Sequence, residues 1–183
     1  MFHRDKQRTV ETYMGVVIVI LFAISLYVVE WSSIGSHAVG QYNNGYGTFD
    51  MKSYSVDIVT QVLNQMEPRG FVVYKKYFVA DFFFVLTFGS LQIMLLNMVY
   101  KWNKNKIKYI LWTVPVLRGI FDIIENIMLL TVLNRFPIIS ERIIHISSIA
   151  TGLKLLMIKI WTVIFIVGIL WGIIKRREII AKK

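Results

Sequence analysis

Four stretches of the chain are long and apolar enough to cross the hydrocarbon core of a bilayer, which takes about 20 helical residues. They cover residues 12–31, 78–100, 109–134 and 143–174. Hydrophobic residues make up 56% of the 183 residues, whereas soluble domains average roughly 45–50%. The sequence therefore predicts an all-α fold, a four-span transmembrane helical bundle that forms one integral membrane domain over residues 1–183.

The first apolar stretch follows a short basic segment, an order that is also found in secretory signal peptides. Its apolar run is about as long as a full span and lacks a clear small-x-small cleavage site. We therefore expect residues 12–31 to remain in the protein as a membrane helix.

Lysine and arginine are distributed unevenly between the segments that join the apolar stretches. Residues 1–11, 101–108 and 175–183 are strongly basic, whereas residues 32–77 mix bases with acids and residues 135–142 hold only two arginines. The positive-inside rule therefore predicts that both termini are cytoplasmic and that residues 32–77 form an outer loop. The net charge of +10 then reflects orientation and contact with lipid headgroups, so membrane lipids are expected partners and nucleic acid is not. The predicted location is a bacterial-type plasma membrane, with the protein crossing it several times.

The outer loop contains a segment with the period of a helix. Ser55 stands where an N-cap is expected, and apolar side chains recur at helical spacing from Val56 to Met66. Pro68 is interpreted as the end of this segment. The sequence thus predicts a short amphipathic helix that lies on the outer membrane face or caps the bundle, either to fold the loop back or to act as a lid over a substrate.

The third apolar stretch carries four polar side chains near its middle, at Arg118, Asp122, Glu125 and Asn126. The first three fall on one stripe of a helix, because an α-helix has about 3.6 residues per turn. Each charge at the centre of a membrane costs about 2.5–3.5 kcal/mol on insertion scales. A helix with three such charges does not serve only as an anchor, and Pro115 is expected to kink it.

Two other stretches supply polar partners at matching depths. Thr151 and Lys154 share one stripe of the fourth stretch, and a rise of about 1.5 Å per residue brings Lys154 level with Asp122. Asp81 lies about one turn inside the second stretch. With Lys159 included, three acids face three bases, the near-neutral balance that a low-dielectric interior requires. The candidate residues for ligand binding or a proton relay are Asp81, Arg118, Asp122, Glu125, Asn126, Thr151 and Lys154.

Several classes of chemistry lack support in the sequence. The chain has no cysteine, which removes disulfides, thiolate metal ligands and a cysteine nucleophile. His145 is interpreted as an interfacial side chain, and no metal site or cofactor is expected. The familiar phosphate-loop, zinc-protease, serine-hydrolase and dinucleotide motifs do not occur, so whether the protein is an enzyme stays open.

Three classes of function remain open. The leading hypothesis is a small integral membrane protein with a buried polar site, open toward the outer face, that binds or modifies a small polar or lipid-headgroup ligand. The first alternative is a non-catalytic accessory or immunity-type membrane protein, which would use a membrane-protein partner. The second is a proton- or ion-coupled transporter or channel, which with so few spans would need a homo-oligomer. The same intramembrane charges could also serve only to pair helices.

Overall fold

A computed structural model describes residues 2–101 and 107–181, and all regular secondary structure in these ranges is helical. The all-α prediction is therefore confirmed for the described part of the chain. Some basic residues used for the orientation argument, Lys104 and Lys106 in one loop and Lys182 and Lys183 in the tail, lie outside the described residues. The helices are α1 (Phe2–Trp31), α2 (Ser36–Gln41), α3 (Val56–Asn64), α4 (Pro68–Val99), α5 (Ile107–Leu111), α6 (Thr113–Arg135) and α7 (Glu141–Ala181).

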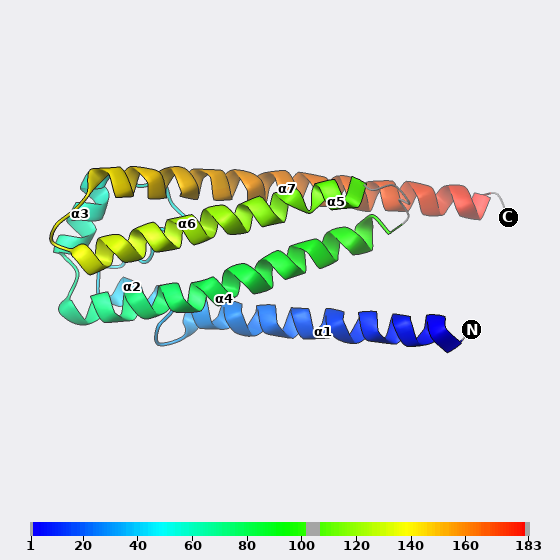
Figure 1. The fold of residues 1–183 in the computed structure, drawn as a ribbon, viewed down its shortest axis with the longest axis horizontal. Helices are drawn as coiled ribbons and strands as arrows, with labels where there is room; N and C mark the ends of the chain where they lie inside the picture. The colour runs from blue at the N-terminus through cyan, green and yellow to red at the C-terminus, as the bar shows by residue number, and fades with distance from the viewer. Residues whose placement is uncertain (1, 102–106, 182–183) are drawn as a thin grey trace.

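Four long helices run side by side along the length of the molecule, in the spatial order α1, α4, α6, α7 (Figure 1). The most extensive contacts are between α6 and α7, followed by α1 with α4 and α4 with α6. The short helices α2 and α3 lie at one end, which we call the capped end (Figure 1). The start of α1 and the finish of α7 lie at the other end, which we call the terminal end (Figure 1).

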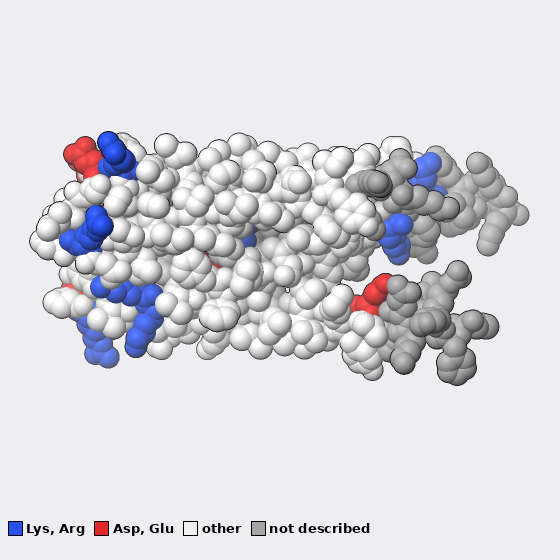
Figure 2. All heavy atoms as spheres, in the orientation of Figure 1, with Lys and Arg blue, Asp and Glu red and all other residues white. Residues whose placement is uncertain are grey.

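Three segments of the described chain are long and apolar enough to cross a membrane: Val10–Gln41, Pro68–Val99 and Glu141–Lys175. They include most of α1 and all of α4, together with the greater part of α7. Large apolar side chains are exposed along these helices, as on lipid-facing surfaces. On the face drawn in Figure 2, charged side chains gather toward the two ends and leave a broad uncharged band between them, with only small charged patches inside it. Helix α6 has 23 residues but carries three charges within about two turns. It is not one of the three segments that are apolar enough to cross a membrane.

Two boundaries differ from the predicted ones for a local reason involving proline. Helix α4 begins at Pro68, ten residues before the predicted start at Phe78, and Pro68 occupies the first helical turn. Proline is favourable there because that position needs no backbone N–H; the sequence analysis had interpreted Pro68 only as the end of the preceding helix. The third apolar stretch is divided between α5 and α6, and Pro115, which was expected to kink the stretch, lies in the first turn of α6, shortly after this division.

The segment that joins α1 to α4 is more ordered than its composition suggests. Residues 36–41, part of the predicted outer loop, form the short helix α2. Helix α3 follows Ser55, whose Oγ accepts a hydrogen bond from Ile58 N at 3.3 Å. Val59, Val62 and Leu63 on α3 are buried. The chain between the two helices is therefore fixed at both ends.

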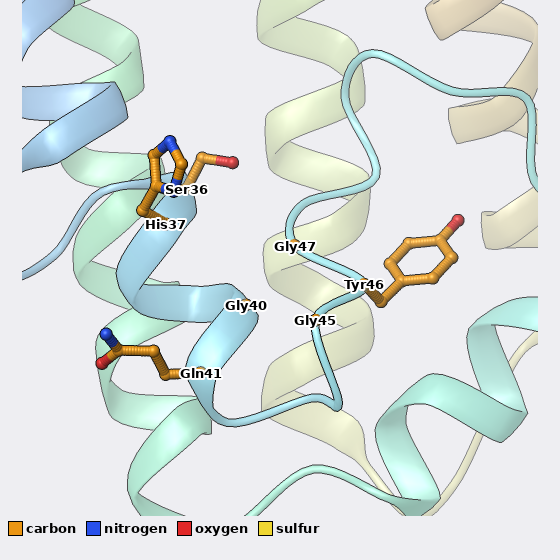
Figure 3. A pocket seen from close by; sticks show the side chains of 7 residues that line it. All are labelled: Ser36, His37, Gly40, Gln41, Gly45, Tyr46 and Gly47. Carbon is orange, nitrogen blue, oxygen red and sulfur yellow. The ribbon is translucent and has the colours of Figure 1, made fainter.

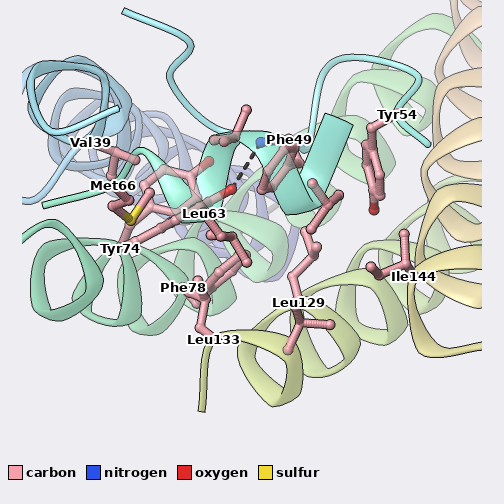
Figure 4. Packing of buried hydrophobic residues seen from close by; sticks show 14 of the residues in the cluster. Val39, Phe49, Tyr54, Leu63, Met66, Tyr74, Phe78, Leu129, Leu133 and Ile144 are labelled. Carbon is pink, nitrogen blue, oxygen red and sulfur yellow. Dashed lines mark hydrogen bonds between the residues drawn. The ribbon is translucent and has the colours of Figure 1, made fainter. Parts of the chain in front are cut away.

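An aromatic core holds the capped end together (Figure 4). Tyr74 stacks on Phe78 with ring centroids 4.8 Å apart, and Phe49 packs against Tyr74 at 6.1 Å. Phe49 N also donates a hydrogen bond to Tyr74 Oη at 2.9 Å (Figure 4). These contacts join the loop before Tyr54 to α4, and they fix where the side chain of Tyr54 meets α7.

Candidate functional site

The predicted polar stripe of α6 faces α7 and is removed from solvent. Arg118, Asp122 and Glu125 on α6 are each no more than 2% exposed, and so are Thr151 and Lys154 on α7. The exposed side chains along the middle of α6, such as Ile120 and Ile127, are apolar, so these three charges face only the neighbouring helices. The long apolar helices on either side therefore shelter a charged interface.

Lys154 is the centre of this interface. Its Nζ lies 3.0 Å from Asp122 Oδ1 and 2.5 Å from Glu125 Oε2. Asp122 Oδ2 also accepts a hydrogen bond from Arg118 Nη2, so one carboxylate bridges two cations. The helical rise per residue predicts that Lys154 lies level with Asp122, and the structure brings the two side chains together.

The interface continues toward the capped end through hydroxyl groups. Thr151 Oγ1 donates to Glu125 Oε1 at 2.5 Å and lies 3.2 Å from Tyr54 Oη. Tyr54 Oη also shares a hydrogen bond with Ser147 Oγ at 2.6 Å. Burial, and after it the negative charge of Glu125, raises the pKa of the Tyr54 phenol to about 12. The tyrosine therefore stays neutral and can act as a hydrogen-bond partner over the whole physiological pH range.

Hydrogen bonds and ion pairs thus form one continuous chain from the loop at the capped end to Arg118 in the second turn of α6. We call this chain the polar network. From Glu125 to Arg118 it extends about 10 Å along the axis of α6. Its members are, in order, Tyr54, Thr151, Glu125, Lys154, Asp122 and Arg118.

Two further buried acids lie on the α4 side of the bundle. Asn126 Nδ2 donates to Asp81 Oδ2 at 2.6 Å, so two predicted residues meet across α4 and α6. Tyr77 donates to Asp50 Oδ2 at 2.8 Å. Asn126 Oδ1 and Asp50 Oδ1 are buried without a hydrogen-bond partner in the described part of the protein. These atoms leave acceptor capacity that a proton or a water molecule could use.

The Arg118 end of the polar network also has side-chain donors without a hydrogen-bond partner in the described part of the protein. Within residues 2–101 and 107–181, Arg118 Nε and Nη1 have no hydrogen-bond partner. The guanidinium instead stands over the ring of Phe88, 4.4 Å from its centroid, in a cation–π contact. Gln92 lies one turn after Phe88 on α4. Its side-chain oxygen and nitrogen are both buried and have no hydrogen-bond partner among the described residues.

The structure changes the charge inventory. Lys159, counted among the potentially buried bases, is exposed. Asp50, which the sequence analysis did not select, is 9% exposed and counts as buried. Among the residues whose burial is described, the buried charged side chains are four acids against two bases, Arg118 and Lys154, rather than three against three. The four acids are Asp50, Asp81, Asp122 and Glu125.

Other predicted features remain apart from the network. His145 is exposed at the start of α7. Among the described residues, no three or more histidine, cysteine or acidic side chains are grouped so that they could hold a metal ion. Tyr54 and Asp50 were missed because both lie in irregular chain at the capped end, where periodicity carries no signal.

Two pockets formed by the described residues are not lined by the polar network. One of about 580 Å³ lies at the capped end between α2 and residues 45–47, where the side chain of Tyr46 points away from that of His37 (Figure 3). The other, of about 470 Å³, lies between α1 and α4. In this conformation the network is therefore closed to both pockets.

A closed chain of carboxylate, ammonium and hydroxyl groups can store a proton and pass it along by small shifts of hydrogen bonds, since each member donates to or accepts from the next. It offers no placed nucleophile. The chain matches no protein-family model, and comparisons with curated proteins and with solved structures find no match either, so geometry and charge alone point to its role.

Proposed function

We propose that this is an integral membrane protein with four spanning helices, α1, α4, α6 and α7. Exposed apolar side chains in the middle of α7, such as Val163 at 61% and Val167 at 52%, support contact with lipid, because soluble proteins rarely expose continuous apolar faces. Helix α6 lies between α4 and α7, so its charges would be shielded from lipid. The basic terminal end is cytoplasmic and the capped end is outside, in a membrane of the bacterial plasma-membrane type.

Cysteine labelling tests this orientation, because the chain has no cysteine of its own. Gln41→Cys at the capped end and Lys101→Cys after α4 each introduce one thiol at an exposed position. A membrane-impermeant maleimide added to intact cells should label the first and spare the second until the membrane is opened. Equal labelling of both in intact cells would contradict the four-span arrangement.

We further propose that the polar network binds an exchangeable proton that is reached from the outside through Tyr54. The observation that carries this proposal is the unbroken chain of hydrogen bonds and ion pairs from Tyr54 to Arg118. Proton-coupled transport, with the protein as an oligomer, is the activity that such a relay would serve. Intramembrane ionisable side chains that face a bundle interior are typical of proton pathways.

The charge inventory supports the same proposal. Four buried acids exceed two buried bases, so a fully ionised interior would carry two uncompensated negative charges. Burying an unpaired charge is very costly, and the group neutralises instead. We propose that an exchangeable proton offsets part of this negative charge. Glu125 is the acid closest to the outer end of the chain, so we assign the exchangeable proton to it.

The experiment is infrared difference spectroscopy on proteoliposomes while the outer pH is stepped. The wild type should show a carboxylic-acid band that rises as the pH falls, and Glu125→Gln should remove it. Glu67→Gln, which changes an exposed glutamate before α4, is the matched control and should leave the band intact. Tyr54→Phe should slow the response because it interrupts the outer end of the chain.

A second candidate function has its own supporting observation. Arg118 Nε and Nη1 are buried and unpartnered among the described residues, and a planar guanidinium suits a carboxylate or phosphate. A small anionic ligand or lipid headgroup bound there would fit the original hypothesis of a polar-ligand site. If the infrared band is the same in wild type and Glu125→Gln while an added anion raises the melting temperature, this candidate replaces the proton relay. If neither response occurs, an accessory role through a membrane-protein partner remains.

A further inference from the structure

An apolar groove of about 470 Å³ runs between α1 and α4, on the opposite side of the bundle from the α6–α7 interface. Its walls include Ile24 and Val28 on α1 with Val79 and Phe83 on α4. Ile24, Val79 and Phe83 are each more than half exposed, so the groove opens to the surroundings of the protein. The volume lies within the range of small-molecule sites, about 300–1,000 Å³.

The polar atoms at the bottom of the groove are already satisfied. Ser25 Oγ and Thr87 Oγ1 are 2.6 Å apart and share a hydrogen bond across the two helices. Each hydroxyl also lies within hydrogen-bonding distance of a carbonyl on its own helix, Ser25 of Phe22 O at 2.9 Å and Thr87 of Phe84 O at 3.1 Å. The groove therefore has no unsatisfied hydroxyl there to recognise a polar ligand, and its surface suits a hydrocarbon chain.

The length of the groove corresponds to one leaflet. On α4 it extends from Lys76 to Thr87, about 16 Å at a rise of about 1.5 Å per residue. Half of a hydrocarbon core of about 30 Å is about 15 Å. In the proposed orientation Lys76 lies toward the outer headgroups and Thr87 toward the middle of the membrane.

Lys76 is the charged residue that lines this groove, and it is exposed at the end nearest the capped end. Within residues 2–101 and 107–181 it forms no ion pair with a carboxylate. A lysine at the headgroup end of an apolar groove attracts an anionic headgroup more than a zwitterionic one.

We propose that the α1–α4 groove holds one acyl chain of an anionic phospholipid, with the phosphate of that lipid at Lys76. The proposal rests on the membrane-spanning arrangement proposed above but not on proton binding by the polar network. The contacts between α1 and α4 are less extensive than those between α6 and α7, and the acyl chain would fill the groove that this looser packing leaves.

Native mass spectrometry of the full chain in mild detergent tests the proposal with two added lipids, phosphatidylglycerol and phosphatidylcholine of the same chains. Phosphatidylglycerol should bind more tightly to the wild type. Lys76→Gln should weaken its binding about fivefold, the effect expected for one lysine at an anionic lipid surface. Val79→Trp, which fills the groove from its exposed rim, should weaken binding of both lipids.

Two control variants change neighbouring positions that do not line the groove. Lys75→Gln removes the adjacent lysine, and Val72→Trp adds the same indole at an exposed valine two turns from Val79. Both should bind phosphatidylglycerol as the wild type does. Equal binding of the two lipids by the wild type, or an equal loss in Lys75→Gln and Lys76→Gln, would overturn the proposal. Lipid binding is measured without a pH step. A negative result would therefore contradict the lipid proposal and would not affect the proposal of proton binding.

Discussion

The two outer helix pairs of the bundle are joined by opposite means. Helices α6 and α7 meet through charges, with Lys154 between Asp122 and Glu125. Helices α1 and α4 meet through apolar side chains and a single neutral hydrogen bond between the described side chains of Ser25 and Thr87. Both pairs are built from long apolar helices, so the chain shows that it can join two helices without any buried charge.

This difference bears on why the charges are present. A neutral hydrogen bond between membrane helices contributes on average about 0.6 kcal/mol, and apolar packing supplies the rest. A buried ion pair must first overcome the desolvation of both partners and often adds no net stability over a well-packed apolar pair. Pairing helices therefore does not require the polar network. The desolvation free energy that the network requires is explained if the network has a chemical role.

The largest effect expected is on the α6–α7 pair. Lys154→Met leaves surplus negative charge, and Asp122→Leu leaves both Arg118 and Lys154 short of a partner. Each should lower the free energy of unfolding by about 3–5 kcal/mol, the usual cost of breaking a buried pair. Thermal melting in detergent measures this. The double variant should recover part of the loss, whereas additive losses would show that the two side chains are not coupled.

Tyr54, at the capped end of the network, predicts that stability depends on alkaline pH. The unfolded Tyr54 phenol loses its proton above pH 10, whereas the folded one retains it to about pH 12. The folded state then binds more protons, so stability falls between these pH values, by about 2–3 kcal/mol for this residue. Between these pH values, the melting temperature of Tyr54→Phe should fall less steeply with rising pH than that of the wild type. Tyr13→Phe, which changes an exposed tyrosine on α1, should melt with the wild-type slope.

The cap of α3 offers a smaller test of how the loop positions Tyr54. Ser55 follows Tyr54 directly, and its Oγ accepts the hydrogen bond from Ile58 N. Ser55→Ala should cost about 1 kcal/mol, as other N-cap losses do. Melting should show a modest shift, and the infrared response to pH should slow. A slower response with unchanged melting would mean that the cap orients Tyr54 without stabilising α3.

The smallest effect is expected in the α1–α4 pair. Ser25→Ala removes the one described side-chain hydrogen bond between these helices and should cost about 0.6 kcal/mol. Chemical denaturation in mixed micelles can resolve a change of this size. A loss as large as that of Lys154→Met would remove the contrast between the two pairs.

The register of the charged residues could be predicted because it follows from helix geometry. Two antiparallel helices of known rise fix which depths coincide, and this placed Lys154 level with Asp122. The contact of Asp81 with Asn126 was not predicted, because Asp81 was placed one turn inside a helix that begins ten residues earlier than expected. The same geometry could have excluded Lys159, which lies about 140° around α7 from Lys154 and is exposed.

Other features depend on contacts that periodicity does not encode. Tyr54 and Asp50 reach the interior because Phe49 docks on Tyr74, a contact between segments 25 residues apart. The helical start at Pro68 and the division before α6 are set by local capping and proline chemistry rather than by the apolar pattern. The surplus of buried acid, which supports the functional proposal, became visible only in three dimensions.

The melting temperature of Glu125→Gln tests the central claim most directly. If Glu125 belongs to a surplus of buried acid, the variant should lose about 1 kcal/mol or less. Lys154 keeps its pairing with Asp122, and the new amide can still bond to Thr151 and Lys154. The account predicts near wild-type melting together with loss of the infrared proton response. Unfolding as severe as that of Lys154→Met would show that the carboxylate is structural, and it would contradict the proton-binding role.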